Sequence, residues 1–172
     1  SYMIEVVEKL APEREKHPEL FMLLIDFLGI LEGRGVNEDL LRVFEVRLLD
    51  DLGLRPHVSD CVICHTPFIS GTKVRFSPEK GGALCNRCVK GVSITIPVSI
   101  GTLKTLEMAI KIEPLKIPRL IFSREVRDES REILRGFIRF HTGSVLKSLE
   151  FIEKIKDRVE CGGLTRTGRA GD

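Results

Sequence analysis

Two Cys-x-x-Cys pairs, at residues 61–64 and 85–88, constrain this chain more than any other feature of its sequence. Each pair makes a tight turn that directs two thiolates toward one point. Four thiolates form the tetrahedral shell that Zn²⁺ accepts from sulfur, and no ligand position then remains open for a reacting water. We therefore predict one structural Zn²⁺ per chain, with the ligands Cys61, Cys64, Cys85 and Cys88.

Three other interpretations of the cysteines stay open. A redox role usually places a Cys-x-x-Cys pair at a strand-to-helix junction, and no βαβ pattern surrounds either pair. Residues 61–65 also match the attachment sequence of covalent haem, although the second pair would then have no role. An iron–sulfur cluster is the third alternative. We interpret His65 as an exposed loop residue and His57 as a reserve ligand.

The segment that carries the cysteines differs in composition from the chain on either side. Between residues 55 and 97 the helical periodicity disappears, Gly, Pro and Cys accumulate, and residues 92–96 alternate as a β-strand does. A module with so few large apolar residues needs the roughly 10–16 kcal/mol of apparent binding free energy that a structural Zn²⁺ supplies. We predict an inserted zinc ribbon with a small antiparallel β element.

The flanking regions carry apolar residues at helical spacing. Before the insert, we predict helices over residues 2–10, from Pro18 to Gly33, and from an N-cap at Asn37 to Gly53. The apolar positions of the second and third helices include Phe21, Leu24, Phe27, Leu28, Leu41, Phe44, Leu48 and Leu49.

After the insert, Ser99 is predicted to cap one helix and Ser123 another that ends at Gly143. A connection is expected at residues 114–118 and a last helix at residues 145–156. The apolar or core-facing positions of the two capped helices include Leu103, Leu106, Met108, Ile110, Ile133, Leu134, Phe137, Ile138 and His141.

These elements predict a mainly α protein, a helical bundle with an inserted zinc ribbon that has four cysteine ligands. The first part of the helical domain is expected at residues 1–54 and the insert at 55–97. The second part is expected at residues 98–157, and a flexible tail at 158–172. Cys161, in that tail, is interpreted as a free and dispensable thiol.

Five arginines follow steps of three and four residues along the helix that begins after Ser123. Like charges at this spacing destabilise an isolated helix by a few tenths of a kcal/mol per pair, which favours an anion-binding role. An ordinary solvated face, with Asp128 and Glu132 as partners, is the alternative. Arg42 has the same two interpretations, with Glu38 as its neutralising neighbour. The row consists of Arg124, Arg127, Arg131, Arg135 and Arg139.

Composition excludes several classes of protein. The apolar run at residues 21–25 is far shorter than the about 20 residues of a membrane-spanning helix. The formal charge of +2 is too small for nucleic-acid affinity to follow from net charge alone. No secretory signal is recognisable at the N-terminus, so we expect a cytoplasmic, nucleoid-associated protein. No acid/base pair or nucleophile has a readable motif around it, so we expect no enzymatic activity and no small-molecule substrate.

Several stretches of the chain together resemble the bacterial RecO recombination mediators. They are LRVFEVRLL at residues 41–49, LGLRP at 52–56, the cysteine pairs with FSPEKGGALC at 76–85, and FHTGSVLKSL at 140–149. The similarity extends from about residue 2 to residue 156, and the order and spacing of the stretches are more specific than any one of them.

The resemblance implies a non-enzymatic DNA-repair factor of the RecF pathway. Such proteins bind single- and double-stranded DNA, anneal strands, cooperate with a RecR partner and promote RecA loading. They also capture the acidic C-terminal tail of the single-stranded-DNA-binding protein, and Arg42 matches a basic position of that tail site. The candidate residues for DNA and partner contacts are Arg42, Arg127, Arg131, Arg135, Arg139 and Lys147.

The resemblance does not extend to the oligonucleotide-binding barrel with which RecO proteins begin. No stretch of this chain resembles the alternating strands of that barrel, so we expect weakened DNA binding if the barrel is absent. Two alternative functions remain: a zinc-ribbon accessory protein of transcription or translation, and a thiol or metal enzyme.

Overall fold

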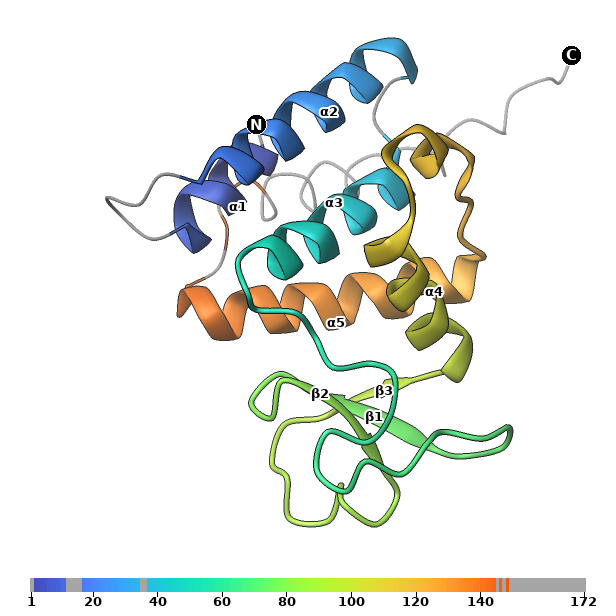
Figure 1. Ribbon diagram of the computed structural model, residues 1–172. Coiled ribbons are helices and arrows are strands. Elements are labelled where there is room, and N and C mark those ends of the chain that lie inside the picture. The colour runs from blue at the N-terminus through green and yellow to red at the C-terminus, as the bar shows by residue number, and fades with distance from the viewer. Residues whose placement is uncertain (1, 12–16, 35–36, 145, 147, 149–172) are drawn as a thin grey trace, which may run out of the picture.

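The computed structural model describes residues 2–11, 17–34, 37–144, 146 and 148 of the chain. These residues form a mainly helical protein with a three-stranded antiparallel sheet at one end. Figure 1 shows helix α3 between α2 and α5, and α5 lying between α3 and the sheet. The predicted fold class, a helical bundle with a small inserted β module, is confirmed.

The first three helices form one side of the bundle. They are α1 (Tyr2–Leu10), α2 (Pro18–Arg34) and α3 (Glu38–Asp51). Asn37 caps α3 as predicted, because its side-chain oxygen accepts a hydrogen bond of 2.8 Å from the backbone N–H of Asp39. In α2, Leu20, Leu23 and Phe27 are buried, whereas the predicted apolar position Phe21 is 64% exposed.

The remaining helices follow the sheet in the chain. They are α4 (Ile100–Lys111), the 3-10 helix η1 (Pro114–Arg119) and α5 (Arg124–Thr142). Ser99 and Ser123 cap α4 and α5 as predicted. Gly143 ends α5 at a φ of 63°, a left-handed conformation that glycine adopts without steric cost. The expected last helix at residues 145–156 lies outside the described residues.

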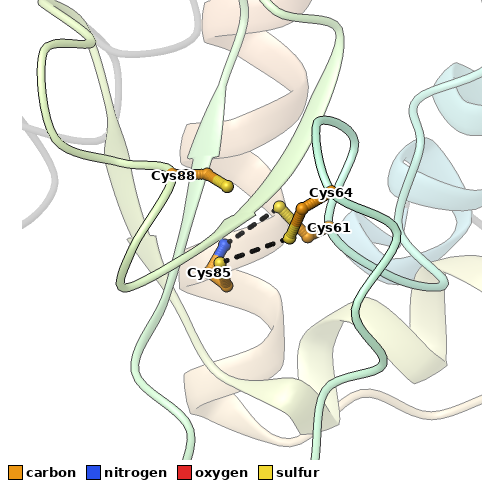
Figure 2. Close-up of side chains that lie close together, drawn as sticks. All are labelled: Cys61, Cys64, Cys85 and Cys88. Carbon is orange, nitrogen blue, oxygen red and sulfur yellow. Dashed lines mark hydrogen bonds between the residues drawn. The ribbon is translucent and has the colours of Figure 1, made fainter.

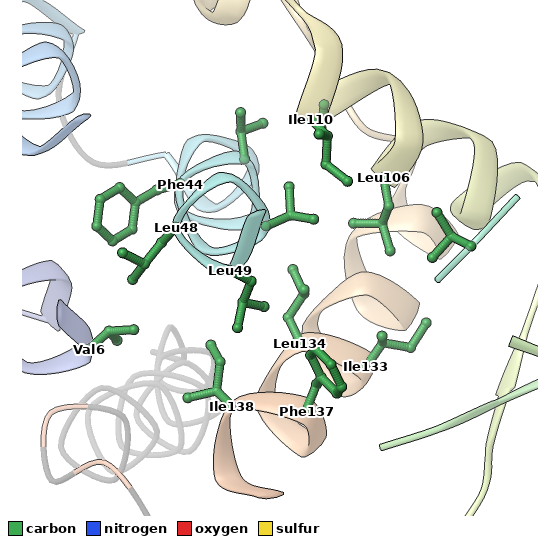
Figure 3. Close-up of a cluster of buried hydrophobic side chains, with 14 of the residues drawn as sticks. Val6, Phe44, Leu48, Leu49, Leu106, Ile110, Ile133, Leu134, Phe137 and Ile138 are labelled. Carbon is green, nitrogen blue, oxygen red and sulfur yellow. The ribbon is translucent and has the colours of Figure 1, made fainter. Parts of the chain in front are cut away.

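One apolar core joins the helices. Figure 3 shows that side chains from α1, α3, α4 and α5 converge on the centre of the bundle. Because α3 faces α2 on one side and α4 and α5 on the others, nearly every apolar side chain along it is buried. The labelled members of this core are Val6, Phe44, Leu48, Leu49, Leu106, Ile110, Ile133, Leu134, Phe137 and Ile138.

The sheet belongs to the cysteine-bearing segment. Its strands are β1 (Val74–Ser77), β2 (Gly82–Cys85) and β3 (Ile96–Val98), in the order β2-β1-β3. Phe76 of β1 packs edge-to-face against Phe137 of α5, with ring centroids 5.6 Å apart. This contact attaches the sheet to the helical core.

The strand expected at residues 92–96 is wrong in position. Only Ile96 of that stretch is in a strand, and β3 continues to Val98. The alternation at residues 92–96 does not mark a buried face, since Ile94 is 64% exposed. Strands β1 and β2 were not predicted, because strands of four residues give too short a pattern to recognise.

Two residues expected on the core side of the later helices lie at the surface instead. Met108 is 49% exposed, and His141 is exposed at the end of α5. The His141 ring packs on Phe137 with a centroid distance of 4.5 Å, and partial burial lowers the pKa of this histidine. His141 therefore covers the edge of the core without entering it.

Candidate metal centre and arginine-rich helix

The four cysteines of the two pairs come together at one point, as Figure 2 shows. Their sulfur atoms all lie within 4.8 Å of one another, and none of the four forms a disulfide. The Sγ atoms of Cys64 and Cys85 are 3.7 Å apart. The arrangement can hold a metal ion, because each cysteine offers one sulfur ligand and the four sulfurs lie close together.

The backbone places the two pairs in the same way. In the first pair the N–H of His65 donates to the carbonyl of Cys61 at 2.8 Å, and in the second the N–H of Val89 donates to Cys85 at 3.0 Å. The N–H of Val62 also donates to Ala83 of β2 at 2.9 Å, which holds the first turn against the sheet. Each turn therefore presents its two thiols at a fixed spacing.

Hydrogen bonds lower the pKa of two of the four thiols. The side chain and backbone of Thr66 lower the pKa of Cys64 to about 6, and backbone N–H groups near Cys88 lower the pKa of Cys85. Sharing hydrogen bonds with the ionised thiols raises the pKa of Cys88 to about 12. Four thiolates at this spacing repel one another, so a bound cation is needed to keep all of them ionised.

Two arginines of the predicted row are paired with carboxylates of α3. Arg127 holds Asp39 through two hydrogen bonds of 2.6 and 3.1 Å, and Asp39 is only 2% exposed. Hydrogen bonding to this carboxylate raises the pKa of Arg127. Arg131 pairs with Glu38, with Asp128 at 3.7 Å as a further partner. These side chains cross-link α3 and α5.

Arg42 lies inside the bundle. Its side chain is 5% exposed and forms an ion pair of 2.9 Å with Glu45, which also accepts a hydrogen bond from the Tyr2 hydroxyl. Burial raises the pKa of both Glu45 and Tyr2. The expected neutralising partner Glu38 belongs instead to Arg131. In this structure the Arg42 guanidinium faces Glu45 and not a surface groove.

The remaining arginines of the row differ in accessibility. Arg139 is exposed near the end of α5, Arg124 is exposed at its start, and Arg135 is half-buried. Lys147 lies outside the described residues. The structure thus divides the row into three half-buried members, Arg127, Arg131 and Arg135, and two exposed ones at the ends of the helix, Arg124 and Arg139.

Sequence reasoning missed a carboxylate of α5 that holds the start of α4. Glu129 of α5 accepts hydrogen bonds from the backbone N–H and the hydroxyl of Ser99, at 2.9 and 2.8 Å. Negative charge at the start of α4 complements its helix dipole. The sequence of α5 gave no sign of this contact, because Ser99 lies 30 residues earlier in the chain.

Comparison with known proteins identifies the family. The family model "Recombination protein O C terminal" matches residues 1–150. The chain belongs to this family. The predicted resemblance to RecO proteins is confirmed.

Named relatives agree with this assignment. DNA repair protein RecO of Syntrophus aciditrophicus is 35% identical over 158 residues, which cover 91% of this chain and 61% of the relative. The RecO of Anaeromyxobacter dehalogenans strain 2CP-C is 35% identical over 161 residues, with 90% and 60% covered. The RecO of Roseiflexus is 30% identical over 168 residues, with 97% and 59% covered. The chain thus spans about three-fifths of these RecO proteins, and no solved structure matches it.

Within residues 2–11, 17–34 and 37–144, no helix is both long and apolar enough to cross a lipid bilayer.

Proposed function

We propose that this chain acts in DNA repair as a non-enzymatic, zinc-stabilised binding module of the RecO kind, in the cytoplasm. The observation that carries the proposal is the family match over residues 1–150. The gathered thiols agree with it, since a closed four-sulfur shell leaves no position for a substrate. The match favours DNA repair over the transcription, translation and enzyme alternatives.

Zn²⁺ is the metal that suits the cysteine cluster. In a tetrahedral site with Zn–S bonds of about 2.3 Å, the sulfur atoms lie about 3.8 Å apart. The Cys64 and Cys85 sulfurs are 3.7 Å apart, so these two are already at the spacing of ligands, and all four sulfurs lie within 4.8 Å of one another. Both pairs contribute, which favours one shared metal over haem attachment. Zn²⁺ held by Cys61, Cys64, Cys85 and Cys88 would have a structural role.

For DNA, we propose that phosphate contacts come mainly from exposed cations of the ribbon. Lys73, Arg87 and Lys90 are exposed, and none of them has a carboxylate partner among the described residues. Arg127 and Arg131 are engaged by α3 carboxylates, so a phosphate would have to displace Asp39 or Glu38. Counterion release from DNA then supplies the affinity for single and double strands.

For protein partners, we propose a RecR-like protein and the acidic tail of the single-stranded-DNA-binding protein. An acidic peptide needs an accessible cation beside an apolar surface. Arg139 is exposed and is followed by Phe140, which is 52% exposed. This end of α5 therefore meets the chemical requirement better than the buried Arg42. Such contacts would support strand annealing and RecA loading.

The DNA proposal is tested by the salt dependence of binding. Fluorescence anisotropy with a single-stranded oligonucleotide gives the slope of log K against log salt for the full chain. Replacing Lys73, Arg87 and Lys90 with Ala should reduce the magnitude of the slope by about 2, because each lost phosphate contact removes roughly 0.7.

A matched control removes the same charge from lysines that already have partners. Lys80, Lys111 and Lys116 pair with Glu79, Glu107 and Glu113 at 2.9, 2.7 and 2.8 Å. Their triple Ala variant should retain most of the parent slope. Equal slopes for the parent and for the first variant would refute the assignment to the ribbon, and a parent slope of zero would refute DNA binding itself.

A further inference from the structure

A second group of metal-binding side chains lies beside the cysteines and is not part of that site. His57 Nε2 lies 2.8 Å from Asp60 Oδ1, and His65 Nδ1 lies 3.2 Å from the same oxygen. One ligand atom from each of the three residues lies within 4.8 Å of the others. Two imidazoles and a carboxylate are a donor set that holds Zn²⁺ when a remaining position is left to water.

The separations suit coordination. Ligand atoms on a tetrahedral Zn²⁺ with bonds of about 2.0–2.1 Å lie about 3.3 Å apart. The two distances to the Asp60 oxygen, 2.8 and 3.2 Å, are close to this value, and the two histidine nitrogens lie within 4.8 Å of each other, so rotation of the imidazoles would bring all three ligand atoms onto one ion. The three side chains are therefore already close to the positions of ligands.

Backbone contacts within the ribbon position two of the three residues, His57 and Asp60. His57 pairs with the start of β2: its N–H donates to Gly81 at 2.9 Å, and its carbonyl accepts from Ala83 at 2.8 Å. Gly82 permits this approach, because a Cβ at residue 82 would lie 2.7 Å from the His57 carbonyl oxygen. Asp60 forms a backbone bridge with Pro67. Folding of the ribbon thus fixes the backbone of His57 and Asp60.

The backbone at His65 adds a further observation. His65 has a φ of 54°, and it is the one residue other than glycine with a positive φ among the described residues. Glycine would adopt this left-handed conformation with less strain. The turn after Cys64 nevertheless carries an imidazole, which is directed at Asp60.

We propose that His57, Asp60 and His65 form a second site for a divalent cation of the Zn²⁺ type, adjacent to the four-cysteine centre. Its side chains are 34%, 28% and 70% exposed, so water or another ligand can complete the coordination. The Asp60 carboxylate and the net charge of −2 on a Zn²⁺ with four thiolates both favour a second cation nearby. The cysteine site is closed and structural, whereas this site is open and exchangeable.

The experiment measures metal stoichiometry on the full chain. Metal-free, reduced protein is titrated with Co²⁺ and then Zn²⁺, with absorption spectra recorded for Co²⁺ and equilibrium dialysis for Zn²⁺. The parent should bind a tight equivalent with thiolate-to-Co²⁺ charge transfer and a weaker equivalent without it. His65→Gly, which suits the local backbone, and Asp60→Asn should each weaken the second equivalent by more than about tenfold.

The first equivalent serves as the folding control for these variants, because its charge-transfer band reports an intact cysteine site. His141→Gln removes an exposed histidine from α5 and should leave both equivalents unchanged. One equivalent in the parent would overturn the proposal. So would a second equivalent that His65→Gly and Asp60→Asn leave unaltered, or one that His141→Gln weakens equally.

Discussion

The helical bundle and the ribbon are stabilised by different means. In the bundle, large side chains such as Phe27, Phe44 and Leu134 are fully buried, and burial of apolar surface supplies most of the stability. In the ribbon, the separate buried cluster consists of Leu84 and two of the cysteines, Cys61 and Cys85. Other buried apolar side chains of the ribbon, among them Val74, Phe76 and Ala83, belong to the core of the bundle, so this separate cluster is built largely from cysteines. A short module can fold in this way without a large apolar core.

The two regions meet at α5. Phe76 of the ribbon packs on Phe137, and Gly136 lies so close to the ribbon that a Cβ at residue 136 would be 3.0 Å from Ile96 Cδ1. Loss of the metal should therefore unfold the ribbon and uncover one side of α5, while the contacts between α3 and the other helices remain. Substitutions in the two regions should accordingly differ in what they disrupt.

The largest effect is expected for Cys85→Ser. Structural Zn²⁺ contributes roughly 10–16 kcal/mol of apparent binding free energy, and loss of one thiolate removes a large part of it. The variant should fail to retain stoichiometric metal and should lose the structure of the ribbon, as measured by elemental analysis and circular dichroism. Cys161→Ser removes a thiol outside the two pairs and should retain both properties. Full metal content in Cys85→Ser would contradict the four-ligand site.

A smaller effect is expected for Asp39→Asn in the bundle. The substitution removes the negative charge that pairs with the Arg127 guanidinium. It also weakens the hydrogen bond of 3.1 Å that the backbone N–H of Phe122 donates to residue 39. We expect the free energy of unfolding to fall by about 1–3 kcal/mol, because Arg127 is partly exposed and can recover some hydration.

Urea denaturation measures this loss. Asp128→Asn is the matched control, because its carboxylate is 3.7 Å from Arg131 at the surface and should contribute less than about 1 kcal/mol. Equal losses in the two variants would show that the link between α3 and α5 is no stronger than a surface pair.

The smallest effect is expected in the pH dependence of the free energy of unfolding. Burial lowers the pKa of His141 in the folded protein, so the unfolded chain binds the proton more readily. Stability should therefore fall as the pH drops below about 6.5, the ordinary histidine pKa, toward the lower folded value. The difference in unfolding free energy between the parent and His141→Gln should shrink over this range. A difference independent of pH would contradict the packing of a neutral ring on Phe137.

Features set by neighbouring residues could be predicted from the sequence. The caps at Asn37, Ser99 and Ser123 and the left-handed end at Gly143 each depend on a few consecutive residues. The cysteine cluster could also be predicted, because two short turns that each carry a pair of thiols are typical of a four-sulfur metal site.

Features that depend on distant residues could not be predicted. The partners of Arg127 and Arg131 lie 88 and 93 residues earlier in the chain, so their spacing on α5 indicated a row but not its neighbours. The residues next to Arg42 in the sequence favour an exposed position. Its burial could not be predicted, because its pairing with Glu45 depends on how α1 covers α3. The group around Asp60 was missed because its two imidazoles meet only after the chain turns at Cys61.

We propose that metal held by the four cysteines folds the ribbon, whereas apolar packing folds the bundle. Hydrogen exchange on the metal-loaded and the chelator-stripped protein tests this central claim most directly. We expect the amides of Val62, His65 and Val89 to lose protection on stripping, whereas those of α3 should keep it. Equal protection of the ribbon amides in both forms would contradict the claim.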